Sequence, residues 1–138
     1  MVIEGRQELA ELSRAEAMSL LASAPAGRLV FTSRALPAVR PVNHQVSGDQ
    51  IVIGLSPGSA IAASAQGTGT VVAYEADDLD PVSQSGWSVI VVGMARLVAD
   101  QVAAEQYRAS LQSWLSGAGA DILLVQAELV TGYRLGPS

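Results

Sequence analysis

The chain of 138 residues is long enough for one domain with a sizeable core, and 49% of its residues are hydrophobic while only 4% are aromatic. Its formal net charge of -5 argues against a nucleic-acid partner, because the phosphate backbone would be repelled. The sequence has no cysteine, no lysine and one histidine, His44, which excludes disulfides, thiolate and Schiff-base catalysis, and a multi-histidine metal site within one chain.

The first segment, residues 1–12, is polar, and we expect it to form a flexible N-terminal arm of a single domain that spans residues 1–138. It lacks the apolar core of a signal peptide, and no segment could span a bilayer, so we expect a cytoplasmic protein without a membrane partner. Ser13-Arg14-Ala15-Glu16 then has the form of a capping box, which predicts a helix that ends before Pro25 and covers one end of a barrel.

A three-stranded meander follows, in which apolar, β-branched segments alternate with turn residues. The predicted strands are residues 27–32, 38–42 and 50–53, and the turns are residues 33–37 and 47–49. Ser56-Pro57 then predicts a short helix that ends at Gly67, because serine is a good N-cap and proline suits the first helical position.

The second half of the chain predicts three more strands and a third helix. A strand over residues 70–75 leads into an acidic loop, and the mostly apolar strand over residues 87–98 has Gly93 at a bend or bulge. The acidic loop contains Asp77, Asp78 and Asp80. Asp100 can cap a third helix, which has Trp114 and Leu115 on its apolar stripe and ends at Gly117. The last predicted strand covers residues 122–135. Six strands with small helices at the crossings predict a mainly β protein, a six-stranded antiparallel barrel with about three short helices.

The segment Arg40-Pro41-Val42-Asn43 is the first candidate binding element. Side chains alternate along a strand, so Arg40 and Val42 face one way while Pro41 and Asn43 face the other. Proline indicates an edge or a bulge, and an edge that presents an arginine and backbone groups could bind a flat polar ring or an anion. The residues alone favour a solvated arginine on an edge strand over such a binding site.

Two other patterns give weaker evidence for a functional site. Gly54-Leu55-Ser56-Pro57-Gly58 matches the nucleophile elbow of hydrolases, but the only histidine precedes the serine, so we reject a serine hydrolase. We expect His44 to be neutral and hydrogen-bonded rather than a ligand contact.

The order of several segments resembles the pyridoxamine 5'-phosphate oxidase-like family, the FMN-binding split β-barrels. The matching segments are LSRAEAMSLLASAPAGRLVFT, PAVRPVN, a strand ending in PGS, YEADDLDP, GWSVIVVGMARLV and VTGYRL. The resemblance implies a split barrel, a homodimer with two equivalent sites at its interface, and a flavin-dependent oxidoreductase. It implies no catalytic residue, because the isoalloxazine ring carries the redox chemistry.

The resemblance also implies which residues surround the flavin. The segment RPVN would run beside the ring and the tail, two serines would face the phosphate, and two residues from later strands would close the site. These residues are Arg40, Pro41, Val42, Asn43, Ser56, Ser59, Trp87 and Arg134.

The chain departs from the family at the phosphate. Family members usually read Phe-Arg-Thr where this chain has Ile53-Gly54-Leu55, and often lysine where it has Ala60. Without a guanidinium the phosphate loses its strongest hydrogen bonds, which leaves the predicted helix start at residues 56–59 to attract an anion. FMN binding is then weakened, and two alternatives stay open: a deazaflavin, or a cofactor-free dimer that binds another small ligand or acts as a non-catalytic binding protein.

Overall fold

The computed structural model describes residues 2–3, 7–111 and 119–137, which form three helices and nine strands. The helices are α1 (Arg14–Ser23), α2 (Ala60–Ser64) and α3 (Gln101–Ser110). The strands are β1 (Val2–Ile3), β2 (Gln7–Glu11), β3 (Ala26–Ser33), β4 (Leu36–Ser47), β5 (Gln50–Leu55), β6 (Thr70–Asp80), β7 (Ser85–Leu97), β8 (Asp121–Gln126) and β9 (Leu129–Pro137). No helix within these ranges reaches the length and hydropathy that a membrane crossing requires.

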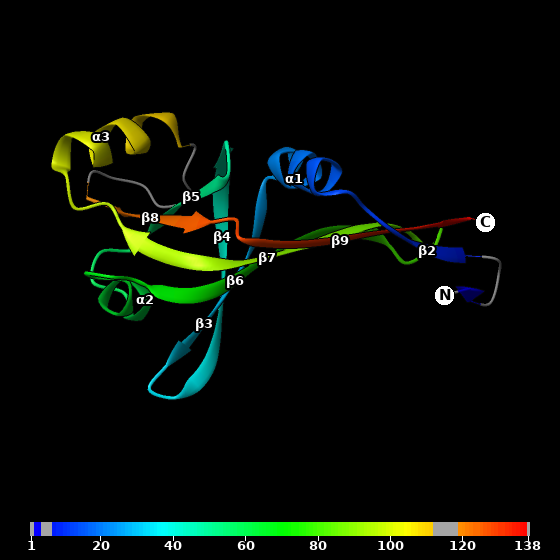
Figure 1. Ribbon diagram of the computed structural model, residues 1–138, viewed down its shortest axis with the longest axis horizontal. Coiled ribbons are helices and arrows are strands. Elements are labelled where there is room, and N and C mark those ends of the chain that lie inside the picture. The colour runs from blue at the N-terminus through cyan, green and yellow to red at the C-terminus, as the bar shows by residue number, and fades with distance from the viewer. Residues whose placement is uncertain (1, 4–6, 112–118, 138) are drawn as a thin grey trace.

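Six of the strands close into a barrel. The sheet order is β1-β2-β9-β7-β6-β3-β4-β5-β8, and an additional pairing joins β8, the last strand, back to β7, so that β3, β4, β5, β8, β7 and β6 form the ring. Every pairing within this ring is antiparallel, which confirms the predicted mainly β, six-stranded antiparallel barrel with about three short helices. β9, β2 and β1 continue the sheet outside the ring, beneath α1, as an extension that points to the right in Figure 1.

The barrel splits where β7 changes partners. Its first part, from Gly86 to Val92, pairs with β9, and its last part, from Ala95 to Leu97, pairs with β8. Gly93 lies between the two parts, and a Cβ atom added there would lie only 1.7 Å from the carbonyl oxygen of Gln126. The glycine that predicted a bend therefore marks the point where the backbone of β8 passes against β7.

The predicted last strand, 122–135, is in fact two strands, because the chain leaves the barrel between them. Ala127 and Glu128 separate β8 from β9. The Ala127 amide donates to the Asp49 carbonyl at 2.8 Å, and its own carbonyl accepts a hydrogen bond from the Arg14 guanidinium of α1. The break thus satisfies its backbone groups through other elements, as a buried chain requires.

The N-terminal part of the chain is more ordered than its polar composition predicts. The expectation of an arm over residues 1–12 is wrong for Gln7–Glu11, which form β2 and pair along β9. The capping box is confirmed, since the Ser13 hydroxyl accepts from the Glu16 amide and the Glu16 carboxylate accepts from the Ser13 amide. These bonds hold the pKa of Glu16 below its usual value.

The second helix begins later than the sequence predicts. Its N-cap is Ser59 rather than Ser56, and it ends at Ser64 rather than at Gly67. The reason is Gly58, whose φ of 70° is left-handed and cannot belong to a right-handed helix. Residues 56–59 are instead a turn, closed by the Ser59 amide donating to the Ser56 carbonyl at 3.2 Å.

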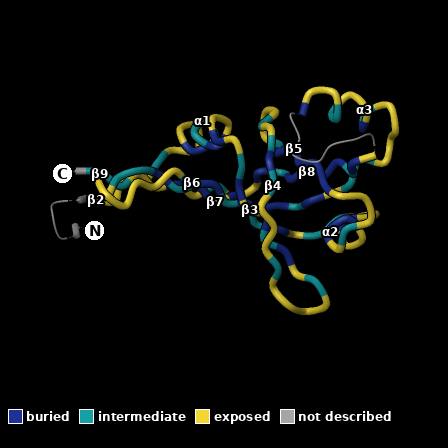
Figure 2. Tube along the Cα trace, turned by 180° about the vertical axis from the view of Figure 1, so that it is seen from behind, coloured by how far each residue is buried: buried dark blue, intermediate teal, exposed yellow. Residues whose placement is uncertain are grey.

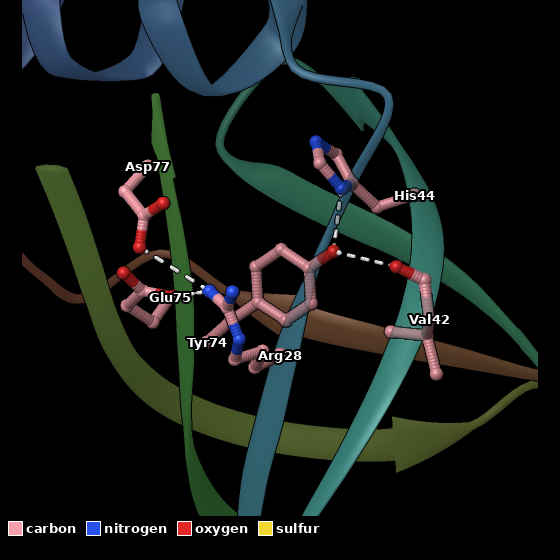
Figure 3. A network of polar contacts seen from close by, with 6 residues as sticks. All are labelled: Arg28, Val42, His44, Tyr74, Glu75 and Asp77. Carbon is pink, nitrogen blue, oxygen red and sulfur yellow. Dashed lines mark hydrogen bonds and ion pairs between the residues drawn. The ribbon is translucent and has the colours of Figure 1, made fainter. Parts of the chain in front are cut away.

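The predicted acidic loop is part of a strand. Asp77, Asp78 and Asp80 lie in β6, which pairs with β7 as far as Asp80. Figure 3 shows why these charges are tolerated: Arg28 of β3 reaches Glu75 at 2.6 Å and Asp77 at 3.2 Å. Burial, together with a hydrogen bond to Asp77, raises the pKa of Glu75 against the opposing effect of Arg28.

The third helix starts as predicted, with the Asp100 carboxylate accepting from the Val102 amide. Trp114, Leu115 and Gly117, which the sequence analysis placed in the same helix, lie outside the described residues. α3 covers the outer side of the barrel over a small apolar cluster formed by Val52, Ala104, Leu111 and Ile122. Figure 2 shows this arrangement as buried strands beneath a helix whose outward face is exposed.

A buried polar network connects α1 to two barrel strands. The hydroxyl group of Tyr74, a fully buried residue, donates to Nδ1 of His44 at 2.5 Å (Figure 3). Nε2 of the same ring donates to the Leu21 carbonyl at 2.7 Å, which leaves Nδ1 as the acceptor. The hydroxyl also lies 3.5 Å from the Val42 carbonyl. Burial raises the pKa of Tyr74 and lowers that of His44, so both side chains are neutral, as the sequence predicts for His44.

We predict that Gly93→Ala destabilises the protein by about 3 kcal/mol, because the new methyl group collides with the backbone at Gln126. Chemical denaturation followed by circular dichroism would measure this loss. Gly136→Ala is the matched control, since a Cβ atom there meets nothing within 4 Å. Equal unfolding midpoints for the two variants would contradict the close approach.

We predict that the free energy of unfolding decreases as the pH falls below about 6.5. In that range the unfolded chain binds a proton on His44 that the folded chain does not, because burial lowers the pKa of His44 in the folded state. The slope is at most about 1.4 kcal/mol per pH unit and ends at the folded-state pKa.

The matched variant is His44→Gln, which can keep a donor to Leu21 and an acceptor for Tyr74 but has no titrating ring. Urea denaturation between pH 7 and roughly pH 5.5 should give a flatter profile for this variant than for the parent. Parallel profiles would show that His44 is not the group responsible.

Candidate functional site

A cavity of about 360 Å³ lies in a wedge between β4 and β5. These strands pair from Ser47–Gln50 to His44–Ile53 and then separate, because β4 continues along β3 while β5 continues along β8. The residues that line the wedge are Phe31, Arg40, Pro41, Val42, Asn43, Gly54, Leu55, Ser56, Ser59, Ala60 and Ile61. The opening therefore results from two neighbouring strands that pair with different strands beyond this point.

The structure brings together most of the residues that the sequence analysis selected. Arg40, Pro41, Val42, Asn43, Ser56 and Ser59 all line this one cavity. Segments separated along the chain meet here because β4 supplies one wall while β5 and the start of α2 supply the other.

Trp87 and Arg134 lie elsewhere in the same chain. They are register partners on β7 and β9, and Trp87 also pairs with Asp78 near the far end of β6. The other end of β6, at Thr70, follows α2. The nine residues from Thr70 to Asp78 span about 26 Å of strand, and neither Trp87 nor Arg134 lines the cavity of its own chain.

The wall formed by β4 presents a cation beside backbone groups. No strand of the described residues pairs with the edge of β4 that faces the wedge between Arg40 and Val42. In an antiparallel strand, alternate residues direct their N–H and C=O groups to that edge. The network described above fixes this wall from behind, since Tyr74 touches the Val42 carbonyl.

Arg40 is the only charged residue among those that line the cavity. Its guanidinium group donates to the Val39 carbonyl at 3.0 Å and lies over the Phe31 ring, 5.9 Å from the centroid. This cation–π contact favours one orientation of a long side chain. The remaining walls are largely apolar, so the cavity combines one cation with surfaces suited to a flat ring.

The loop end of the cavity differs from the expected anion site. The Gly58 amide, which the sequence analysis offered to a phosphate, donates to the Asp121 carboxylate at 3.2 Å. The Ser59 amide is engaged by the Ser56 carbonyl, and the Ser59 hydroxyl accepts from the Ala62 amide. The backbone amides that were expected to bind the ligand therefore form hydrogen bonds within the chain instead.

Asp121 is the residue that sequence reasoning missed. It stands alone at the start of β8 and belongs to no motif, and it reaches the loop only because β8 pairs with β5, where Asp121 is opposite Leu55. The positions that carry basic or hydroxyl groups in the family, Gly54, Leu55 and Ala60, all line this cavity and supply neither.

A continuous apolar row crosses the outer face of the sheet. Val39, Val30, Ala73, Val92 and Leu129 are consecutive cross-strand partners on β4, β3, β6, β7 and β9. None of them is buried; Val39 is 50% exposed and Leu129 is 67% exposed. An aligned apolar row of this length is typical of an interaction surface rather than of scattered surface residues.

Comparisons with known proteins agree with this architecture. The uncharacterized protein Rv0080 of Mycobacterium tuberculosis is 46% identical over 136 residues, which cover 96% of this chain and 89% of that protein. The FAD binding protein from Mycobacterium smegmatis is 28% identical with a TM-score of 0.73, over 91% of this chain and 97% of the other. A FAD-binding protein from Mesorhizobium loti shares the fold, with a TM-score of 0.75 at 20% identity, over 94% of this chain and 98% of the other.

The family model described as pyridoxamine 5'-phosphate oxidase matches residues 13–134, which include every strand of the barrel and the whole wedge between β4 and β5. The resemblance of the separate segments is thereby confirmed over most of the chain, and the protein belongs to the pyridoxamine 5'-phosphate oxidase family.

Proposed function

We propose that the cavity between β4 and β5 binds the ring of a flavin or deazaflavin, and that the protein is a flavin-dependent oxidoreductase. The observation that carries this proposal is the wedge itself, an apolar slot with an open strand edge and one cation, Arg40. Its volume lies at the lower end of the range for small-molecule sites, about 300–1,000 Å³, which suits one ring system whose tail leaves through the mouth. Two comparisons support the choice of a flavin: the family to which the chain belongs, and the structural similarity to the FAD binding protein of Mycobacterium smegmatis.

The residues present fit such a ring. Phe31, Leu55 and Ile61 offer apolar contact to its faces, and the open edge of β4 offers donors and acceptors to its polar rim. Arg40 would stabilise negative charge on the ring, since a guanidinium group is a strong donor to an anionic partner.

A bound flavin would supply the electron-transfer chemistry, and the chain would supply orientation and electrostatics. None of the residues that line the cavity is an aspartate, a glutamate or a histidine, so no side chain there is placed to act as an acid or a base. The walls on β4 and β5 would exclude water from both faces of the ring.

The second candidate function is a cofactor-free barrel that binds another small ligand or acts as a non-catalytic partner. The observation that favours it is the loop end of the cavity, where Gly54, Leu55 and Ala60 replace the residues that hold the phosphate in the family. A direct binding experiment separates it from the first.

We also propose that the protein is a homodimer whose outer apolar row forms the interface. In a monomer this row stays in water, whereas a second copy would cover it with the same surface, as two-fold symmetry requires. The second copy would then be the source of the Arg134 side chain that closes each site, because Arg134 does not line the cavity of its own chain; Trp87, its register partner, is buried in the core of its own chain.

The flavin proposal predicts saturable binding of FMN, FAD, riboflavin or a deazaflavin, seen as a shift in the visible absorption spectrum. Arg40→Gln should weaken the tightest of these ligands about tenfold, because it removes a charge-assisted contact. Arg96→Gln, an exposed arginine outside this cavity, has the same net charge and should bind as the parent does. A protein that leaves all four spectra unchanged would favour the cofactor-free alternative.

The dimer proposal predicts that Ala73→Arg, at the centre of the apolar row, shifts the protein from dimer to monomer in sedimentation velocity experiments. An unpaired cation at the centre of an apolar interface costs several kcal/mol, which is enough to dissociate it. Val82→Arg is the control, because Val82 is 92% exposed in the turn between β6 and β7, away from the row. A parent protein that sediments as a monomer would contradict the proposal.

A further inference from the structure

The loop end of the cavity has a carboxylate beside it, at the place where the family resemblance puts the phosphate. Asp121 is half-buried, and its Oδ2 accepts the Gly58 amide at 3.2 Å. Gly58 lies between Ser56 and Ser59, and Asp121 is opposite Leu55, and all three of these neighbours line the cavity. The carboxylate therefore lies directly beside this end of the cavity, although it is not one of the residues that line it.

No arginine of the described residues forms an ion pair with Asp121, and the chain contains no lysine. The charge at this end of the cavity is thus not neutralised by a partner. A terminal phosphate monoester, which carries nearly two negative charges at neutral pH, would be repelled there. It would also find the Gly58 amide already engaged.

We infer that Asp121 is a specificity-determining residue, which selects flavins without a terminal phosphate monoester over FMN. This inference rests on the proposed flavin site and adds the ligand class to it. Arg40 gives the cavity its one cation, while Asp121 places an anion beside the loop end, where it opposes a dianionic phosphate. A neutral ribityl tail meets no such penalty, and its hydroxyl groups can hydrogen-bond to a carboxylate.

The test is a comparison of riboflavin and FMN binding to the parent and to Asp121→Asn. Asparagine keeps an oxygen that can accept the Gly58 amide, so the variant removes the charge and preserves the turn. Asp78→Asn is the matched control, because Asp78 is exposed at the far end of β6 and its replacement changes the net charge equally. Dissociation constants would come from equilibrium dialysis, with thermal unfolding as a check of folding.

The expected result is that the parent binds riboflavin at least as tightly as FMN. Asp121→Asn should tighten FMN about tenfold while changing riboflavin by less than about twofold, and Asp78→Asn should change neither. A parent that prefers FMN, or an Asp121→Asn variant that shifts both ligands equally or neither, would overturn the inference and leave the flavin site standing. Failure of every flavin to bind the parent would overturn the proposed function and this inference with it.

Discussion

The barrel depends on one close approach, the carbonyl of Gln126 against the backbone of Gly93. At this point β7 leaves one partner for another, so that β8 closes the ring on one side and β9 leads away on the other. If β7 kept β9 as its partner throughout, β8 would end as an open edge and the ring would not close. The wedge between β4 and β5 lies on the opposite edge of β5 from β8, which pairs with β5 along its whole length.

The sequence predicts the features that depend on neighbouring residues. The capping box at Ser13 and the apolar strands of the barrel follow from local pattern, and Arg40–Asn43 stands out because a proline and an arginine share one strand. What it does not predict is set by partners that are distant in the chain. The acidic end of β6 is a strand because it pairs with β7 as far as Asp80, and the last strand divides because β7 has two partners. Local strand propensity predicts neither of these two features.

The candidate site likewise has features that the sequence predicts and features that depend on distant strand pairing. Six of the eight predicted side chains line one cavity, because they come from two short segments whose separation is small in sequence and in space. The charge at the loop end could not be predicted, because Asp121 has no sequence signature and matters only through strand pairing. The departure at Gly54 and Ala60, visible in the sequence as missing cations, is thus accompanied in the structure by an added anion. Both changes make the same end of the cavity less suited to a phosphate.

The packing around Tyr74 links three positions that are far apart in the chain. A Cβ atom at Gly27 would lie 2.6 Å from the Tyr74 ring and 2.5 Å from the backbone carbonyl oxygen of Glu75, so a smaller residue at position 74 would not make room for it. The loss of the Tyr74 hydroxyl group would leave Nδ1 of His44 without its donor. In evolutionary terms, the backbone itself retains the glycine, whereas Tyr74 and His44 are tied to each other by one hydrogen bond. A substitution at either of these two positions leaves a buried polar atom on the other, so descent with a different solution requires a change at both.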